Sequence, residues 1–341
     1  MNNYNKILVT GGCGFIGSTL VKMLVKSGKQ VLNVDSITYA GNLESLKEIE
    51  NYENYQFRKI DICDSNMFNI IKTFEPEAIL HLAAESHVDN SIHSPSVFIH
   101  TNIFGTFNLL EASKKYYNEL TDDAKQKFRF LLVSTDEVYG SLGKTGLFSE
   151  SSNYDPRSPY SATKASADHL AMAWYHTYKL PVLKTNCSNN YGSHQYPEKL
   201  IPKVIINALN EQPLPIYGTG ENIRDWLFVE DHCLGIIQVL NEGLPGETYN
   251  IGGRNEKTNL EVVKTICEIL DEECPRVNGL SYKDLITFVE DRKGHDKRYA
   301  IDPTKIETKL NWQPAETFET GIRKTVKWYI NNEAWWKPLM D

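Results

Sequence analysis

The chain has 341 residues, which is enough to bury a large core in one large domain or two. Its 36 basic and 44 acidic residues give a net charge of -8, which argues against a nucleic-acid backbone or an anionic membrane as the main partner. The six cysteines are scattered and form no Cys-x-x-Cys pair, so we expect no metal, no disulfide framework and a reducing, cytoplasmic location. No apolar run approaches the roughly 18 residues of a membrane span, and the first strand pattern runs into glycines, not into a signal-peptide cleavage site.

Short apolar runs rich in Val, Ile and Leu alternate with helical stretches along the first half of the chain. This pattern is typical of a parallel sheet that is covered by helices on both faces. We expect strands at residues 6–10, 30–35, 55–61, 78–84, 128–134 and 181–186, and helices that begin near Phe15, Leu43, Ser65, Pro95 and Pro159. The predicted fold class is therefore α/β, with a Rossmann-like doubly wound parallel sheet.

The regularity weakens after about Asn189, where several prolines interrupt the pattern. We expect a smaller C-terminal α/β domain there, with an exposed loop at residues 272–281. Residues 224–240 and 247–253 look strand-like and helical again, which predicts a return of the chain to the sheet. The first domain would then comprise residues 1–188 and about 222–253, and the second about 189–221 and 254–341.

A glycine-rich stretch, VTGGCGFIGS, stands between the first predicted strand and an amphipathic helix. Gly12, Gly14 and Gly17 match a G-x-G-x-x-G pattern, and Gly11 gives the same spacing in another register. Without β-carbons the backbone can turn tightly and approach a pyrophosphate, whose charge would meet the free N–H groups of the helix N-terminus. A plain tight turn would use the same glycines.

Asp35 ends the second predicted strand, 18 residues after Gly17. A carboxylate at this place can accept hydrogen bonds from an adenosine ribose and would repel a 2′-phosphate, so NAD is favoured over NADP. The alternative for Asp35 is a helix or turn cap. Asp61 and Ile62 close the third strand, where a loop could cover adenine.

A helix start is predicted at SPYSATKASADHL, with Ser158 as N-cap and Pro159 in the first turn. Tyr160 and Lys164 are four residues apart and share a face of that helix. A phenol has a pKa of about 10, and a nearby ammonium would lower it, so the pair could serve as an acid/base unit. On spacing alone an ordinary surface pair is the alternative; a nucleotide loop and a strand ending in Ser134 and Thr135 favour proton and hydride transfer.

Further motifs are HLAAESHVDNS, STDEVYG, NCSNNYG, PEKLIP, IRDWLFVEDH and DRKGHDKRYAID. With the glycine loop and the tyrosine–lysine pair they resemble the extended short-chain dehydrogenase/reductase family, and within it the nucleotide-sugar 4,6-dehydratases that act on dTDP-glucose. The similarity runs from about Lys6 to Asp302. The resemblance implies NAD as cofactor, held by Gly11, Gly12, Gly14, Phe15, Ile16, Gly17, Asp35, Ser36, Thr38, Asp61, Ile62, Leu82, Ala83, Ala84, Thr101, Tyr160, Lys164 and Asn190.

The acidic pair Asp136 and Glu137 follows the strand that ends in Ser134 and Thr135. The resemblance implies that Tyr160, with Lys164 and Thr135, removes the proton of the sugar 4-hydroxyl while hydride passes from C4 to NAD. Glu137 would then take the C5 proton, protonated Asp136 would protonate the leaving 6-hydroxyl, and hydride would return to C6. Because neighbouring side chains of a strand point to opposite faces, both acids can reach one sugar only if the chain leaves the strand there. Two solvated capping residues are the alternative.

Substrate contacts are implied by the same resemblance, and cationic side chains among them would supply the positive charge that an anionic nucleotide sugar needs. They are Ser86, Thr135, Asn189, Lys199, Leu200, Pro215, Tyr217, Arg224, Asn259, Arg292 and His295. The chain departs from the family pattern at Cys13, at Ser193–His194 and at Lys293. We expect Cys13 to be neutral for the turn and the other positions to alter loop rigidity or the fit to base and ribose.

Three functions stay open on this reading. The first is dehydration of dTDP-glucose, whose 4-keto-6-deoxy product could feed rhamnose or other deoxysugar synthesis. The second is a dehydratase for UDP- or CDP-glucose, or a nucleotide-sugar 4-epimerase, although epimerases of this superfamily lack the acidic pair. The third is a NAD-binding regulator without turnover. The resemblance also suggests a homodimer, formed through the helix after Pro95 and the helix that carries Tyr160.

Overall fold

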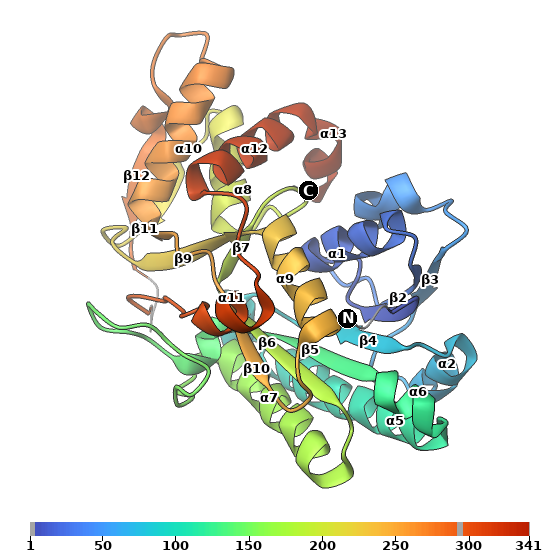
Figure 1. Cartoon of the computed structure of the whole chain (residues 1–341). Helices are drawn as coiled ribbons and strands as arrows, with labels where there is room; N and C mark the ends of the chain where they lie inside the picture. The colour runs from blue at the N-terminus through green and yellow to red at the C-terminus, as the bar shows by residue number, and fades with distance from the viewer. Residues whose placement is uncertain (1–3, 292–295, 341) are drawn as a thin grey trace.

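The protein was studied as a computed structural model, which describes residues 4–291 and 296–340. Figure 1 shows a helix-covered sheet with a smaller lobe at one end, built from α8, α10, α12 and the strands beside them. Within the described residues the main sheet has seven parallel strands. Their order is β10 (Thr248–Ile251), β6 (Val182–Cys187), β5 (Arg129–Thr135), β4 (Ala78–His81), β1 (Lys6–Thr10), β2 (Gln30–Asp35) and β3 (Tyr55–Lys59).

The strand order reverses at β1, which lies between β2 and β4. Such a reversal leaves a crevice at the carboxyl ends of the strands, where ligands bind in open α/β sheets. The expected α/β doubly wound sheet is confirmed, including the return of the chain to the sheet at β10.

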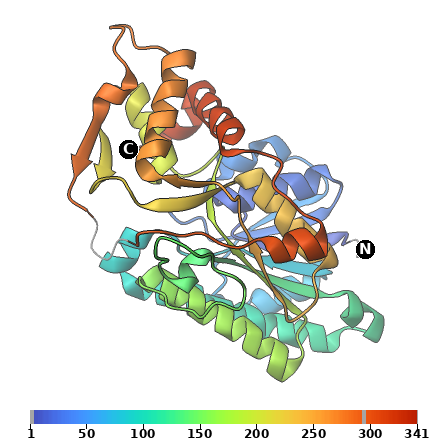
Figure 2. The same cartoon turned by 60° about the vertical axis from the view of Figure 1, so that its left-hand side comes forward.

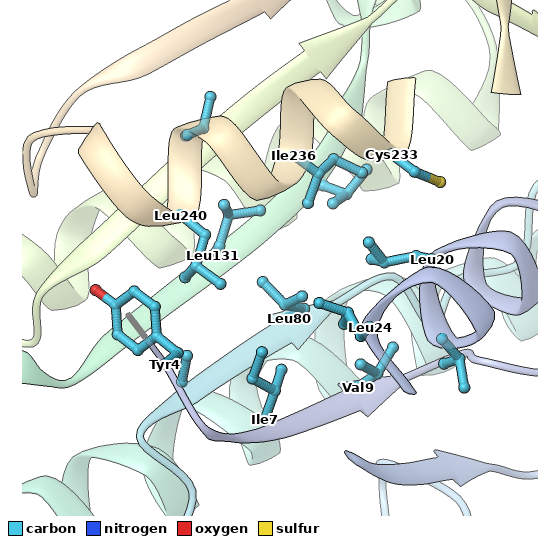
Figure 3. Close-up of a cluster of buried hydrophobic side chains, with 14 of the residues drawn as sticks. Tyr4, Ile7, Val9, Leu20, Leu24, Leu80, Leu131, Cys233, Ile236 and Leu240 are labelled. Carbon is cyan, nitrogen blue, oxygen red and sulfur yellow. The ribbon is translucent and has the colours of Figure 1, made fainter. Parts of the chain in front are cut away.

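Helices cover both faces of the sheet because the strand side chains alternate between two apolar cores. Ile7 and Val9 face one core, and Leu8 faces the other. Figure 3 shows the first core, in which Leu20 and Leu24 of one helix meet the sheet. The helices on this face are α1 (Phe15–Lys26), α9 (Val229–Glu242) and α11 (Thr304–Leu310), and those on the other are α2 (Met67–Phe74), α5 (Thr106–Glu119) and α7 (Pro159–Tyr178).

Several boundaries differ from those expected. β3 ends at Lys59 and β4 at His81, so that residues 60–62 and 82–84 leave the sheet as loops. The helix expected near Leu43 is a 3-10 helix, η1 (Leu43–Ile49), and the one expected near Ser65 begins at Met67. The helical run after Pro95 consists of α4 (Pro95–Phe98), a π-helical turn η2 (Ile99–Gly105) and α5, and it is preceded by α3 (Val88–His93); α6 (Asp122–Lys127) leads into β5.

The smaller lobe has its own apolar core. Its elements are β7 (Asn189–Tyr191), α8 (Leu200–Leu209), β8 (Leu214–Tyr217), β9 (Ile223–Phe228), β11 (Glu256–Thr258), α10 (Asn259–Glu273), η4 (Tyr282–Leu285), β12 (Ile286–Val289), α12 (Phe318–Asn331), α13 (Glu333–Trp336) and η5 (Lys337–Leu339). Strand β9 belongs to both parts, because Leu227 packs in the core of the main sheet whereas Trp226 and Phe228 pack in the smaller one. Residues 274–281 form a partly to fully exposed loop, as expected.

Among the described residues, no helix is both long and apolar enough to cross a membrane.

Candidate active site

Two cavities, of about 320 and 430 Å³, lie at the carboxyl ends of the parallel strands. The first follows the glycine loop and the ends of β1, β2, β4 and β5, and the second lies between the main sheet and the smaller lobe. Five residues line both cavities: Ser86, Glu137, Asn189, Glu198 and Lys199. The cavities therefore meet at the acidic residue that the sequence singled out as the base.

The glycine loop forms a tight turn between β1 and α1. Gly11 has φ of +75°, and a β-carbon on Gly17 would lie 2.0 Å from the Gly11 carbonyl oxygen. Gly14 is the N-cap of α1 and has no side chain to cap the helix, so no side-chain hydrogen bond occupies the first backbone N–H groups, which lie beside the cavity. This cradle fits a pyrophosphate. Gly12 does not line the cavity; a β-carbon there would lie 2.2 Å from Asn33 Oδ1, so it packs the loop on β2.

Asp35 lines the same cavity at the end of β2. Its carboxylate accepts hydrogen bonds from the backbone N–H groups of Cys13 and Ile37, both at 2.8 Å. Burial raises the pKa of Asp35, while these two hydrogen bonds lower it. The carboxylate thus ties the glycine loop to β2, as a capping residue would, and still faces the space where a ribose would lie.

All the other expected cofactor residues line the first cavity: Phe15, Ile16, Ser36, Thr38, Asp61, Ile62, Leu82, Ala83, Ala84, Thr101, Tyr160, Lys164 and Asn190. The two loops that leave the sheet early, residues 60–62 and 82–84, supply five of them. Thr101 comes from the π-helical turn, a distortion often found at functional sites. Asn102 beside it bonds the backbone of Glu85 and the Thr163 hydroxyl, which joins this turn to α7.

The acidic pair lies in a 3-10 turn, η3 (Asp136–Tyr139), directly after β5. Thr135 caps the turn by accepting a hydrogen bond from the Glu137 backbone N–H at 3.3 Å. The chain therefore leaves the strand directly before Asp136 and Glu137, which is the condition for both acids to reach one sugar. Asp136 is 2% exposed, and burial followed by the charge of Glu137 raises its pKa well above the ordinary value. Of the two acids, Asp136 is therefore the one whose surroundings favour the protonated form.

Tyr160 and Lys164 are buried on α7 and line the first cavity. Lys164 Nζ donates to the Val133 carbonyl oxygen at 2.9 Å. Burial lowers the pKa of Lys164, although the negative charge of Asp168 raises it in part. Burial and the charge of Glu137 raise the pKa of Tyr160 well above the ordinary value, whereas a hydrogen bond from Thr135 lowers it. The expected net lowering of the Tyr160 pKa is thus wrong for the free chain, because desolvation outweighs the neighbouring groups.

Eight expected substrate residues line the second cavity: Ser86, Asn189, Lys199, Leu200, Pro215, Tyr217, Arg224 and Asn259. Thr135 lines the first cavity, and Arg292 and His295 lie outside the described residues, as does Lys293. Arg224 is held by the carbonyl oxygens of Ile223 and Asp296, at 2.7 and 3.0 Å, and stacks 4.3 Å from the centroid of the Tyr299 ring. Its guanidinium is preorganised for an anion.

Sequence reasoning did not single out Glu85, Tyr196, Glu198, Arg157 and Tyr299, which also line the cavities. Glu85 is buried, and burial raises its pKa. Glu198 accepts a hydrogen bond from the Tyr39 hydroxyl at 3.1 Å, across the first cavity. A signal existed for three of them, because Glu85 lies in HLAAESHVDNS, Glu198 in PEKLIP and Tyr299 in DRKGHDKRYAID.

Two departures from the family pattern can be placed. Cys13 is buried, and its Sγ accepts a hydrogen bond from Asn33 at 3.5 Å, so it fits the turn. The His194 ring packs on Trp328 and Trp335, with centroids 4.4 and 5.3 Å apart, and burial lowers its pKa to about 3. His194 thus anchors its loop to the last helices and does not line either cavity.

Comparison with known proteins agrees with this site. A family model described as GDP-mannose 4,6-dehydratase matches residues 8–325. A probable dTDP-glucose 4,6-dehydratase of Sinorhizobium fredii is 58% identical over 337 residues, 98% of this chain and 96% of that protein. A dTDP-glucose 4,6-dehydratase of Neisseria meningitidis serogroup B is 56% identical over 341 residues, with 98% and 96% covered.

Among solved structures, dTDP-glucose 4,6-dehydratase from Bacillus anthracis in complex with NAD superposes with a TM-score of 0.87 at 48% identity, covering 98% of this chain and 99% of that one. The match thus extends over both parts of the fold, as the sequence motifs do. The chain belongs to the nucleotide-sugar 4,6-dehydratase family, and within it to the dTDP-glucose 4,6-dehydratases.

Proposed function

We infer that the chain is a NAD-dependent hydro-lyase that converts dTDP-glucose to dTDP-4-keto-6-deoxyglucose and water. The observation that carries this conclusion is the catalytic turn Asp136–Tyr139 at the junction of the two cavities. Oxidation or epimerisation at C4 needs a hydroxyl, a phenol and an ammonium. Elimination needs a separate acid and base in addition, and burial provides them by keeping Asp136 protonated beside Glu137.

Each step is assigned to one group of the site. The residues that line the first cavity would hold NAD, which would supply hydride exchange with C4 and C6 and leave no net oxidation. Tyr160 removes the proton of the 4-hydroxyl, with Thr135 holding the oxygen. Because burial opposes ionisation of Tyr160, its phenolate has to form in the bound complex, where the Lys164 ammonium favours it.

The ketone at C4 acidifies the neighbouring C5–H. Glu137 takes that proton, and Asp136 gives its own to the departing 6-hydroxyl, which leaves as water. Glu137 gives its proton back to C5 once C6 has received hydride. The proton that Tyr160 took from the 4-hydroxyl passes by way of solvent to Asp136, so that all three groups regain their initial states. The balance is one water lost from the sugar and no change in the cofactor.

The two cavities support a division of labour between the parts of the fold. Residues 1–188 and about 222–253 would hold NAD, since the glycine loop and the ends of β1, β2 and β4 line the first cavity. Residues about 189–221 and 254–341 would hold the nucleotide diphosphate, to which Lys199 of this part and Arg224 of the first part offer positive charge.

A homodimer is favoured by an apolar surface on the helical run after Pro95. Ile99, Phe104 and Phe107 of this run are 53%, 46% and 39% exposed, and Tyr178 at the end of α7 is 45% exposed. Apolar side chains clustered in this way mark an interface, and a second copy of the chain would cover them by pairing these helices. Together with the six unpaired cysteines, the NAD chemistry supports a cytoplasmic location.

The direct test incubates the purified chain with dTDP-glucose and no added reductant, and follows the 4-keto-6-deoxy product. UDP-glucose and CDP-glucose are run in parallel under the same conditions. We expect turnover of dTDP-glucose in preference to both. Turnover of UDP-glucose or CDP-glucose alone would show that the nucleobase of the substrate was assigned wrongly but would keep the mechanism. Interconversion of 4-epimers without loss of water would overturn the mechanism itself.

A further inference from the structure

A buried ion pair lies behind the catalytic residues of α7. Tyr160, Lys164 and Asp168 follow one another at four-residue spacing, so they share a face of the helix, and all three are buried. Asp168 Oδ2 lies 3.3 Å from Nζ of Lys184 on β6, and the two side chains are 1% and 7% exposed. Such a pair adds little net stability compared with apolar residues of the same size, so its presence calls for a role in positioning.

Both members of the pair hold the hydroxyl of Tyr154. This hydroxyl donates to Asp168 Oδ2 at 2.6 Å and contacts Lys184 Nζ, which also lies 4.9 Å from the centroid of the Tyr154 ring. Tyr154 belongs to the segment between the catalytic turn and α7. Its hydroxyl end is therefore fixed to the helix that carries Tyr160 and Lys164.

The other side of Tyr154 packs against the catalytic turn. Its ring meets Tyr139, the last residue of the turn, edge to face with centroids 5.3 Å apart. The next residue, Asp155, donates its backbone N–H to the Val138 carbonyl oxygen at 3.1 Å. Gly140, with φ of +88°, leaves the turn so close that a β-carbon would lie 2.5 Å from the Asp155 carbonyl oxygen. The catalytic turn is thus packed against Tyr154 and Asp155.

A small apolar cluster surrounds this contact. It consists of Val138, Tyr139, Phe148, Ala165 and Ile301, with Leu142 and Tyr154 packed against it. Ala165 belongs to α7 and directly follows Lys164, so the turn and the helix share one cluster. Figure 2 shows the green segment that follows the turn running beside the orange-red segment before α11, where Phe148 pairs with Ile301.

We propose that Tyr154, fixed by Asp168 and Lys184, is a positioning residue that holds the catalytic turn in register with α7. The inference rests on the proposed function, in which α7 acts at C4 while Asp136 and Glu137 act at C5 and C6. A turn that shifts relative to α7 leaves the oxidation intact and misplaces the acid and the base. The elimination is then slowed more than the oxidation, and the reduced cofactor accumulates during turnover.

The test compares Tyr154→Phe with Tyr116→Phe as a matched control. Tyr116 is also buried, and its hydroxyl donates to the Pro76 carbonyl oxygen at 3.2 Å, on α5 and outside both cavities. For Tyr154→Phe we expect kcat to fall about tenfold with KM unchanged, because one hydrogen bond to a charged group is lost. The fraction of cofactor in the reduced state, followed at 340 nm in steady turnover, rises several-fold. Tyr116→Phe lowers Tm but leaves kcat and the reduced fraction at the wild-type values.

A second variant removes the partners of the hydroxyl instead of the hydroxyl. Asp168→Leu with Lys184→Met deletes both charges together, which avoids an uncompensated buried ion. It has to raise the reduced fraction as Tyr154→Phe does. A wild-type reduced fraction in either variant, or an equal rise in Tyr116→Phe, overturns the inference. If the wild-type chain itself forms no 4-keto-6-deoxy product, the proposed function fails instead, so the two failures are distinguishable.

Discussion

Asp136 and Glu137 are adjacent in the chain, but the 3-10 turn gives them different surroundings. Asp136 is 2% exposed and lines the first cavity only, whereas Glu137 is partly exposed and lines both cavities. The pKa of the buried carboxyl is raised because its charged form would be desolvated and would face a like charge. This difference supports the opposite roles proposed for the two carboxyl groups, since an elimination needs an acid and a base.

Replacing Asp136 by asparagine should lower activity and raise stability at high pH. Because burial raises the folded-state pKa of Asp136, the folded chain binds this proton more tightly than the unfolded chain. The resulting stabilisation is complete below about pH 4 and is lost as the pH rises through the folded pKa. Asparagine does not ionise, so the Tm of Asp136→Asn relative to wild type should increase between about pH 5 and pH 9.

Thermal scans across that range check this prediction, with the exposed Asp123→Asn as control. The control shows how much the loss of a carboxyl far from the site changes the Tm across the same range. A constant difference for Asp136→Asn would mean that the carboxyl is already ionised in the folded chain, and would remove it as the acid.

Replacing Glu137 by glutamine should separate oxidation from elimination. The amide keeps the shape of the side chain but cannot accept the C5 proton, so product formation should fall by about 10² to 10⁴-fold while reduced cofactor accumulates. Exchange of the C5 proton with deuterated solvent should stop as well. The exposed Glu221→Gln serves as control and should behave as wild type. Normal turnover of Glu137→Gln would show that another group is the base.

At the scale of elements, the carboxyl ends of the strands supply the site while the helices hold it in place. The glycine loop joins β1 to α1, and the catalytic turn joins β5 to the segment that carries Tyr154. Asn186 of β6 supports the second junction by donating to the Thr135 carbonyl oxygen at 2.9 Å. These connections are short and lie against the rigid sheet, which explains how small turns can place reacting groups accurately.

Replacing Gly17 by alanine should remove the cofactor without unfolding the chain. The new β-carbon would lie 2.0 Å from the Gly11 carbonyl oxygen, so the loop has to open and its cradle is lost. Purified Gly17→Ala should contain at least tenfold less bound NAD, measured by absorbance after denaturation. Gly143→Ala is the matched control, because nothing lies within 4 Å of a β-carbon there. Full NAD content in Gly17→Ala would contradict the assignment of this loop.

At the scale of the whole molecule, the active site lies where the main sheet and the smaller lobe meet. Strand β9 contributes to both cores and carries Arg224 into the second cavity, so the two parts are linked through the proposed substrate site. The exposed residues proposed for the dimer interface lie elsewhere: Ile99, Phe104 and Phe107 on the helical run after Pro95, and Tyr178 at the end of α7. None of these four residues lines either cavity.

Replacing Phe104 by glutamate should disrupt the proposed dimer. This side chain is 46% exposed, and a charge buried in an apolar interface would have no partner. Light scattering after size-exclusion chromatography should shift from the mass of a dimer toward that of the 38.9 kDa chain. Val277→Glu in the exposed loop, 103% exposed, should not change the mass. A wild-type mass for Phe104→Glu would place the interface on another surface.

Much of the fold and part of the site could be predicted because they depend on local patterns. Alternating apolar runs predict the strands, and the residues that follow them, such as Asp35, Ala83 and Thr135, line the first cavity because parallel strands end at one edge. The places where strands stop were less predictable. Residues 60–62 and 82–84 have strand-like composition, and only the tertiary structure turns them into cavity walls.

The sequence by itself determined the sheet, the glycine cradle, the tyrosine–lysine pair and the acidic pair, since each is encoded by spacing within one or two elements. Only the tertiary structure decided how these groups titrate, because burial raises the pKa of Tyr160 that a local pairing rule would lower. It alone also brought Tyr154, Asp168 and Lys184 together from a loop, a helix and a strand. The physical reason is that desolvation and contacts between distant elements depend on the complete packing of the chain, which no short stretch of sequence contains.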